Sequence, residues 1–215
     1  MKRRANPAGP SARRDPSSSK DSREQHRLFF AAPVEGTLRA QVQLGLVELS
    51  GRGMDLPGRP VSTDHWHWTL RFVGDCSPRR SRALVQALES ADLPEALALT
   101  AGGLGAFPAP KRARVLWVGP GSPAQAAALT TLAAHLDAAL AAELPQARRS
   151  PFHPHLTLAR LRPPADVRPL LDAWRAPAKA PTWLREVRLY RSHLGHGPPR
   201  YELLALRRLP DNPSH

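Results

Sequence analysis

An internal duplication constrains the fold of this chain more than any other feature of its sequence. The tetrapeptide His-Trp-Thr-Leu at residues 67–70 recurs as His-Leu-Thr-Leu at 155–158, and the two histidines lie 88 residues apart. The segment Arg27–Pro33 is matched by Arg114–Pro120, which begins 87 residues later. An offset that stays nearly constant predicts two structurally equivalent lobes, because a solenoid would need at least three repeats.

Further segments keep the same spacing. A proline-led, helix-like stretch follows each motif, at Pro78–Glu89 and at Pro163–Trp174, and a strand candidate follows each of these stretches. Arg200–Leu206 repeats the second of the matched strands once more, at an offset of 86. Two equivalent lobes place equivalent residues around a pseudo-twofold axis, so we expect His67 and His155 to face each other across one cleft.

The hydrophobic pattern predicts an α+β fold. Runs rich in Val, Leu, Phe and Trp between glycines and prolines predict strands near Arg27–Ala32, His65–Val73, Ala96–Phe107, Ala113–Val118, His153–Leu161, Leu184–His193 and Tyr201–Leu209. Helices are expected near Val34–Leu49, Pro78–Glu89, Pro123–Glu143 and Ala165–Trp174. The third helix is the most strongly marked, because it is rich in alanine, carries a stripe of four leucines and begins with a Ser-Pro cap.

The repeated His-x-Thr motif carries a recognisable chemistry. On a β-strand alternate side chains share a face, so each motif histidine points the same way as the threonine two residues later. Two such strands side by side line one cleft with two imidazoles and two hydroxyls. An imidazole acts as acid or base near neutral pH, and a threonine hydroxyl both donates and accepts hydrogen bonds. These groups suit an anionic substrate whose reaction needs a proton taken at one point and given at another.

Charge and composition divide the chain into three parts. Residues 1–25 hold seven Lys and Arg against three Asp and Glu and almost nothing apolar, and we expect a disordered basic extension. Residues 26–209 are expected to form a single bilobal domain, and residues 210–215 a flexible C-terminus. Of the formal charge of +13, the extension carries +4 and the rest of the chain +9. A body this basic attracts polyanions, most commonly nucleic acid; solvated surface arginines are the alternative explanation.

Composition also limits where the protein works. No apolar run approaches the roughly 20 residues of a membrane span, and no hydrophobic segment follows the basic N-terminus as in a secretory signal. The single cysteine, Cys76, excludes an intramolecular disulfide and fits a reducing compartment. We therefore expect a cytoplasmic protein with no membrane partner, and we expect it to be a monomer.

These segments, together with Gly105-Ala-Phe and Phe152-His-Pro-His-Leu-Thr-Leu-Ala-Arg160, resemble a known family. They are similar to the bacterial and archaeal RNA 2′,3′-cyclic phosphodiesterases of the 2H phosphoesterase superfamily, long called 2′-5′ RNA ligases. The resemblance covers about Arg27 to Leu206, in order. It implies a bilobal α+β fold in which two antiparallel sheets flank a central cleft.

The resemblance also implies an activity and its residues. His67 and Thr69 correspond to the first catalytic pair, and His155 and Thr157 to the second. Members hydrolyse RNA that ends in a 2′,3′-cyclic phosphate, tRNA fragments being one source, to a 2′-phosphate without a metal or other cofactor, and they weakly and reversibly join RNA ends through a 2′-5′ linkage. We assign His67 as general acid and His155 as general base, although the near-symmetry of the motifs leaves their ranking open.

Three further residues are candidates for substrate binding. Arg160, at the family's position after the second motif, is expected to contact phosphate or RNA, although on an unbroken strand it has the opposite parity to His155. Arg114 is a weaker candidate, since its counterparts in the other copies suggest a repeated structural role. Phe72 or Trp68 offers a ring on which the terminal base stacks, unless these aromatics belong to the core.

Two alternatives to the two-histidine enzyme remain open at this stage. His65 and His153 each precede a motif histidine by two residues, and four inward-facing histidines would bind zinc or nickel in a metal-dependent phosphoesterase. The other alternative is a non-catalytic RNA-binding module, which the positive charge favours but which has no need of two intact His-x-Thr pairs.

Overall fold

The structure is a computed structural model that describes residues 26–146, 151–177, 180–193 and 199–211. The expected basic extension lies outside the described residues, as does most of the expected flexible C-terminus. No helix in these ranges is both long and apolar enough to cross a membrane.

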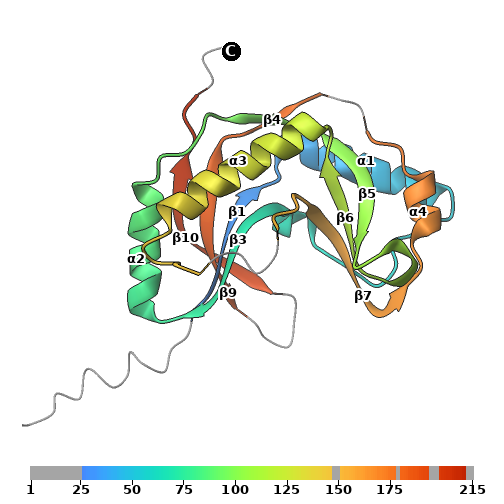
Figure 1. Ribbon diagram of the computed structural model, residues 1–215. Coiled ribbons are helices and arrows are strands. Elements are labelled where there is room, and N and C mark those ends of the chain that lie inside the picture. The colour runs from blue at the N-terminus through green and yellow to red at the C-terminus, as the bar shows by residue number, and fades with distance from the viewer. Residues whose placement is uncertain (1–25, 147–150, 178–179, 194–198, 212–215) are drawn as a thin grey trace, which may run out of the picture.

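The molecule is built on a large antiparallel sheet that divides into two halves (Figure 1). The first lobe contains β1 (His26–Pro33), β3 (His67–Cys76), β9 (Glu186–His193) and β10 (Arg200–Arg208), and the second contains β2 (Arg59–Pro60), β5 (Ala101–Phe107), β6 (Ala113–Pro120) and β7 (Leu156–Ala165). The strand order is β10-β9-β1-β3-β7-β6-β5, with β2 on β7. Between the lobes, β3 and β7 pair only at Trp68 and Leu156. The expected α+β bilobal architecture is confirmed.

The single bridge between the lobes lies at equivalent positions of the duplication. Trp68 and Leu156 follow the first and second motif histidines, and they pair in antiparallel orientation. A second, two-stranded sheet joins β4 (Leu97–Leu99) to β8 (Thr182–Leu184), which are again equivalent segments of the two copies. Antiparallel pairing of equivalent segments is what a pseudo-twofold axis produces.

Each lobe draws strands from both copies of the duplication. Strand β9 belongs to the second copy but pairs with β1 in the first lobe, whereas β5 belongs to the first copy and pairs with β6 in the second lobe. The lobes are therefore interlocked rather than being two consecutive pieces of the chain.

Four helices pack on the sheet (Figure 1). Helix α2 (Pro78–Glu89) packs on the first lobe, and α1 (Gly36–Gly51) and α4 (Arg168–Ala173) pack on the second, whereas α3 (Pro123–Ala139) contacts β3 of the first lobe and β6 of the second. Helix α3 begins as expected, with the Ser122 hydroxyl accepting the amide of Gln125, but it ends four residues before the expected Glu143.

Two expected strands are in fact pairs of strands. The run Ala96–Phe107 breaks at Thr100, whose amide donates to the side chain of Gln125, and the run Leu184–His193 breaks at Arg185, whose carbonyl accepts the amide of Leu209. Each break moves the chain from the small sheet to the large one. Conversely, β7 runs to Ala165 because it pairs with the start of β6, so α4 is shorter than expected.

Candidate active site

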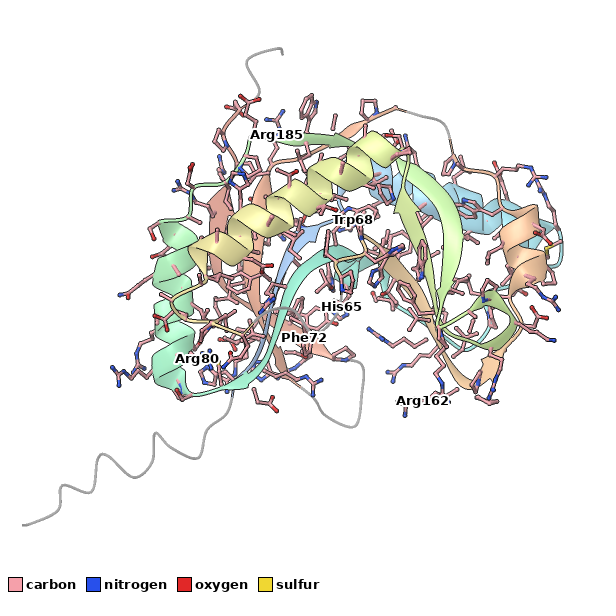
Figure 2. All side chains as sticks on the ribbon, viewed as in Figure 1. His65, Trp68, Phe72, Arg80, Arg162 and Arg185 are labelled. Atoms are coloured by element: carbon pink, nitrogen blue, oxygen red, sulfur yellow. The ribbon has the colours of Figure 1, made fainter. Side chains whose placement is uncertain are left out.

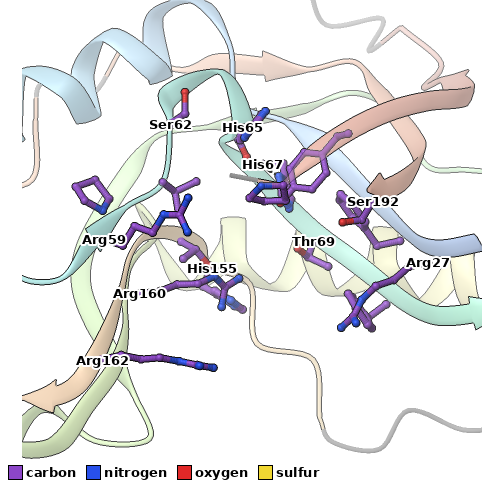
Figure 3. A pocket seen from close by; sticks show the side chains of 17 residues that line it. Arg27, Arg59, Ser62, His65, His67, Thr69, His155, Arg160, Arg162 and Ser192 are labelled. Atoms are coloured by element: carbon purple, nitrogen blue, oxygen red, sulfur yellow. Dashed lines mark hydrogen bonds between the residues drawn. The ribbon is translucent and has the colours of Figure 1, made fainter. Parts of the chain in front are cut away.

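The two His-x-Thr motifs meet in one cavity of about 680 Å³ at the junction of the lobes (Figure 3). His67, Thr69, His155 and Thr157 all line it. The four apolar residues of the two tetrapeptides, one Trp and three Leu, are buried on the opposite face of the sheet. The period-two alternation of the strands thus directs the polar member of each pair to the cavity, as expected.

Both motif imidazoles are held by the same hydrogen bond. His67 Nδ1 lies 2.7 Å from the carbonyl oxygen of His65, and His155 Nδ1 lies 2.7 Å from that of His153. A carbonyl can only accept, so each Nδ1 carries the hydrogen and donates it. In the neutral ring this leaves Nε2 as a free acceptor on each side, ready to take a proton.

Aromatic rings surround the two imidazoles differently. The ring of His67 lies 5.1 Å from that of Phe29 and 5.7 Å from that of Tyr201. The ring of His155 lies 5.0 Å from that of Phe107 and 6.2 Å from that of Trp117. The hydrogen bonds are symmetric, but the surroundings are not.

Burial makes both imidazoles weaker bases than usual. The pKa of His67 is lowered from 6.5 to about 4, chiefly by desolvation; the carbonyl hydrogen bond opposes this shift, and electrostatic interaction with His65 and Arg160 adds to it. Desolvation likewise lowers the pKa of His155. Without a ligand both rings are therefore mostly neutral at pH 7, and a bound anion would favour their protonated forms.

The cavity is strongly cationic. Arg27, Arg59, Arg160 and Arg162 line it, and none of the described lining residues is Asp or Glu. Arg160 reaches this face because β7 contains an irregularity: Leu116 pairs with Ala159 but Trp117 pairs with Thr157, so Leu158 is an extra residue. Because the strand is not regular here, the opposite parity expected on an unbroken strand does not apply, and Arg160 shares the face of the motif side chains.

The other substrate-binding candidates fall in different places (Figure 2). Phe72 lines the cavity with 55% of its surface exposed, and the guanidinium of Arg27 lies 5.4 Å from its ring centre. Trp68 is only 1% exposed and belongs to the core. Arg114 lines a separate depression with Lys111 and other residues of the second lobe, and the structure does not bring it to the cavity.

Sequence reasoning missed several lining residues, among them Arg59, Arg162 and Tyr201. Arg162 could have been found from its spacing, since it follows Arg160 by two residues on one strand. Arg59 and Tyr201 carry no comparable signal, because long-range pairings bring them to the cavity: β2 pairs with β7, and the β9–β10 pair that carries Tyr201 joins β1.

The two additional histidines do not join the motif histidines in one cluster. His65 lines the cavity, and its ring lies 4.7 Å from that of Tyr201. The ring of His153 lies 4.9 Å from that of Trp117. Within the described ranges, no group of three or more His, Cys, Asp or Glu could hold a metal ion. The geometry thus lends no support to the His-x-His metal hypothesis.

Comparisons with known proteins agree with this geometry. Residues 64–196 match the model of the 2′-5′ RNA ligase superfamily. The RNA 2′,3′-cyclic phosphodiesterase of Escherichia coli is 30% identical over 184 residues, which are 83% of this chain and 93% of that protein. The protein of the same name from Aeropyrum pernix is 35% identical over 107 residues, which are 50% of this chain and 59% of that protein.

Solved structures show the same likeness. The structure of Escherichia coli LigT complexed with 3′-AMP aligns with a TM-score of 0.68 at 28% identity, covering 86% of this chain and 99% of that one. A Thermus thermophilus protein aligns with a TM-score of 0.64 at 26% identity, covering 86% of this chain and 98% of that one. The fold, the paired motifs and these matches together establish that the chain belongs to the 2′-5′ RNA ligase superfamily.

Proposed function

We propose that the protein is an enzyme that hydrolyses 2′,3′-cyclic phosphate ends of RNA to 2′-phosphate ends. The observation that carries this proposal is the pair of imidazoles in one cationic cavity, each held by a carbonyl at Nδ1 so that Nε2 is left for the substrate. Relatives that bear the name RNA 2′,3′-cyclic phosphodiesterase support the same reaction.

The reaction needs one proton removed and one supplied. A neutral imidazole takes a proton from water as its oxygen attacks phosphorus, and the bond from phosphorus to the 3′ oxygen breaks. The second, protonated imidazole gives its proton to the departing 3′ oxygen. Each transfer is worth roughly 10²–10⁴ in rate when it is well placed. Thr69 and Thr157 donate hydrogen bonds to the non-bridging oxygens, and Arg160 neutralises their charge.

We assign His67 as the general acid and His155 as the general base. Both pKa values are lowered by burial in the free protein. The imidazole beside the leaving oxygen therefore has to become protonated when substrate binds. The negative charge of the bound phosphate favours this, because it raises the pKa of that imidazole. No bound metal takes part in any of these steps.

Product analysis tests the proposal. An RNA that ends in a 2′,3′-cyclic phosphate is digested in EDTA, and the position of the terminal phosphate is determined by NMR. We expect a 2′-phosphate and full activity in EDTA, with protein carrying His155→Ala as the control for contaminating nuclease. A 3′-phosphate product, or a rate that depends on added metal, would contradict the mechanism.

A non-catalytic RNA-binding module is the second candidate function. The net charge of +13 and the arginine-lined cavity favour RNA binding in either case. If the protein binds a cyclic mononucleotide and a cyclic-phosphate oligonucleotide but hydrolyses neither of them, it is the binding module.

The remaining aspects of the proposal concern its setting. We propose that tRNA fragments with cyclic phosphate ends are among the substrates, that the reverse joining of RNA ends occurs weakly, and that the protein acts as a monomer in the cytoplasm. A complete pair of motifs within one chain supports action as a monomer. The unpaired thiol of Cys76 fits a reducing compartment.

A further inference from the structure

The two walls of the cavity differ in chemistry. On the second lobe, Arg59, Arg160 and Arg162 lie together and extend in the same direction (Figure 3). On the first lobe the lining holds aromatic rings, among them that of Phe72, and one arginine, Arg27. One wall thus presents three guanidinium groups, and the other presents mainly rings.

The arginine wall has no counter-charge. In the part of the chain that the structure describes, no contact pairs Arg59, Arg160 or Arg162 with a carboxylate, whereas Arg168 is paired with Asp166. Arg59 and Arg160 are also direct partners in the β2–β7 ladder. Like charges opposite each other destabilise a sheet, so an anion between the two side chains would relieve a repulsion that the fold otherwise carries.

The position of Arg59 is set by a tight backbone contact. Gly58 has φ +78°, and a Cβ atom there would lie 2.6 Å from the carbonyl oxygen of Arg160. Beyond Arg59, the amide of Val61 donates to the carbonyl of Leu158 over 2.8 Å. The segment that carries Arg59 therefore packs closely against the backbone of β7. Glycine permits this contact because it has no Cβ atom and readily adopts a positive φ.

The cavity holds more positive charge than the reacting group needs. A 2′,3′-cyclic phosphate is a monoanion, and four guanidinium groups line the cavity. Arg160 lies within electrostatic range of both motif imidazoles, since its charge lowers the pKa of His67 and of His155. Arg160 is thus the group suited to the reacting phosphate, which leaves Arg59 and Arg162 on the same wall without a role.

We propose that Arg59 and Arg162 bind the phosphodiester backbone on the 5′ side of the terminal nucleotide, so that the site prefers an oligonucleotide to a mononucleotide. In an RNA with a cyclic phosphate at its 3′ end, every other phosphate lies on the 5′ side. Arg160 and Arg162 are two residues apart on a strand, an advance of about 6.6 Å, which is of the order of the spacing between successive phosphates. The aromatic wall remains free for the bases.

This inference rests on the proposed function. A kinetic comparison of two substrates tests the inference separately from that function. The substrates are a cyclic mononucleotide and a tetranucleotide that ends in a cyclic phosphate. We expect the wild type to show a higher kcat/KM for the tetranucleotide. Arg59→Gln and Arg162→Gln should each lower kcat/KM for the tetranucleotide about tenfold more than for the mononucleotide, because a charge-assisted hydrogen bond to a backbone phosphate is lost.

The matched control is Arg185→Gln, which also removes one positive charge but lies far from the cavity (Figure 2). It should leave the ratio of the two kcat/KM values unchanged. The dependence of log KM on log salt for the tetranucleotide should flatten by roughly 0.7 for each of the two cavity arginines replaced.

The outcomes are distinct. Turnover of both substrates at equal kcat/KM, or equal losses on both in the variants, overturns the backbone-binding role and leaves the proposed function standing. No turnover of either substrate by the wild type overturns the proposed function itself.

Discussion

At the scale of single residues, the tautomer of each motif imidazole is set by the backbone carbonyl of the residue two positions before it. The backbone carbonyls of His65 and His153 accept from the Nδ1 atoms of His67 and His155. These acceptors are main-chain atoms, so the tautomer does not depend on which side chain stands at position 65 or 153. The extra histidines of the sequence therefore need no metal to explain the local geometry.

Substrates with different leaving groups would distinguish the acid from the base. We expect His67→Ala to lose 10²–10⁴ in kcat/KM on a cyclic mononucleotide but far less on bis(4-nitrophenyl) phosphate, whose leaving group needs no proton. The variant His155→Ala should lose the full factor on both, because water still has to be deprotonated. The reverse pattern would exchange the two roles, and a variant that keeps more than about a tenth of the wild-type rate on the mononucleotide would exclude that histidine from proton transfer.

The buried imidazole of His67 also predicts a loss of stability in acid. Its pKa is lowered from 6.5 to about 4 on folding, so between these values the unfolded chain binds a proton that the folded protein does not. The free energy of unfolding should therefore fall as the pH drops from 6.5 towards 4, by at most about 3 kcal/mol from this residue. Urea unfolding at several pH values should show a shallower dependence for His67→Gln than for the wild type. Identical slopes would show that His67 is not desolvated.

At the scale of secondary-structure elements, the irregularity in β7 and the short strand β2 determine half of the cavity. The extra residue Leu158 returns Arg160 to the face of Thr157. Strand β2 then adds Arg59 beside it. The first copy has the same irregularity, because Leu70, the counterpart of Leu158, is an extra residue of β3 in its pairing with β1.

The glycine before β2 provides a test at this scale. Gly58→Ala should destabilise the protein by about 1–3 kcal/mol, since the new methyl group meets the Arg160 carbonyl and the backbone has positive φ. The kcat/KM for a cyclic-phosphate RNA should fall as well, because β2 moves away from Arg160. Gly51→Ala is the control: a Cβ atom there meets nothing within 4 Å. Thermal unfolding and kinetics that are equal for the two variants would refute the tight seating of β2.

At the scale of the whole molecule, the charge is spread beyond the N-terminal extension. Residues 1–25 carry +4 of the +13, and both His-x-Thr motifs lie outside this segment. Deleting residues 1–25 should therefore leave hydrolysis of a cyclic mononucleotide unchanged. RNA affinity of the shortened chain should still fall steeply with salt, which fluorescence anisotropy on the inactive His155→Ala background would measure. Loss of the salt dependence on truncation would assign RNA binding to the extension instead.

The sequence by itself determined the duplication, the two His-x-Thr pairs and the face that they share. These features depend on local alternation along a strand, which survives any change of partner strand. The same local reasoning located α2 and the start of α3.

Only the tertiary structure decided which other side chains complete the cavity. Arg160 faces the motif histidines because β7 pairs irregularly with β6, and Arg59 reaches it from a strand about one hundred residues earlier in the chain. Arg114 lies in a separate depression, and Trp68 is buried in the core. Strand irregularities and long-range pairing depend on the register between distant segments, and side-chain periodicity within one segment does not encode that register.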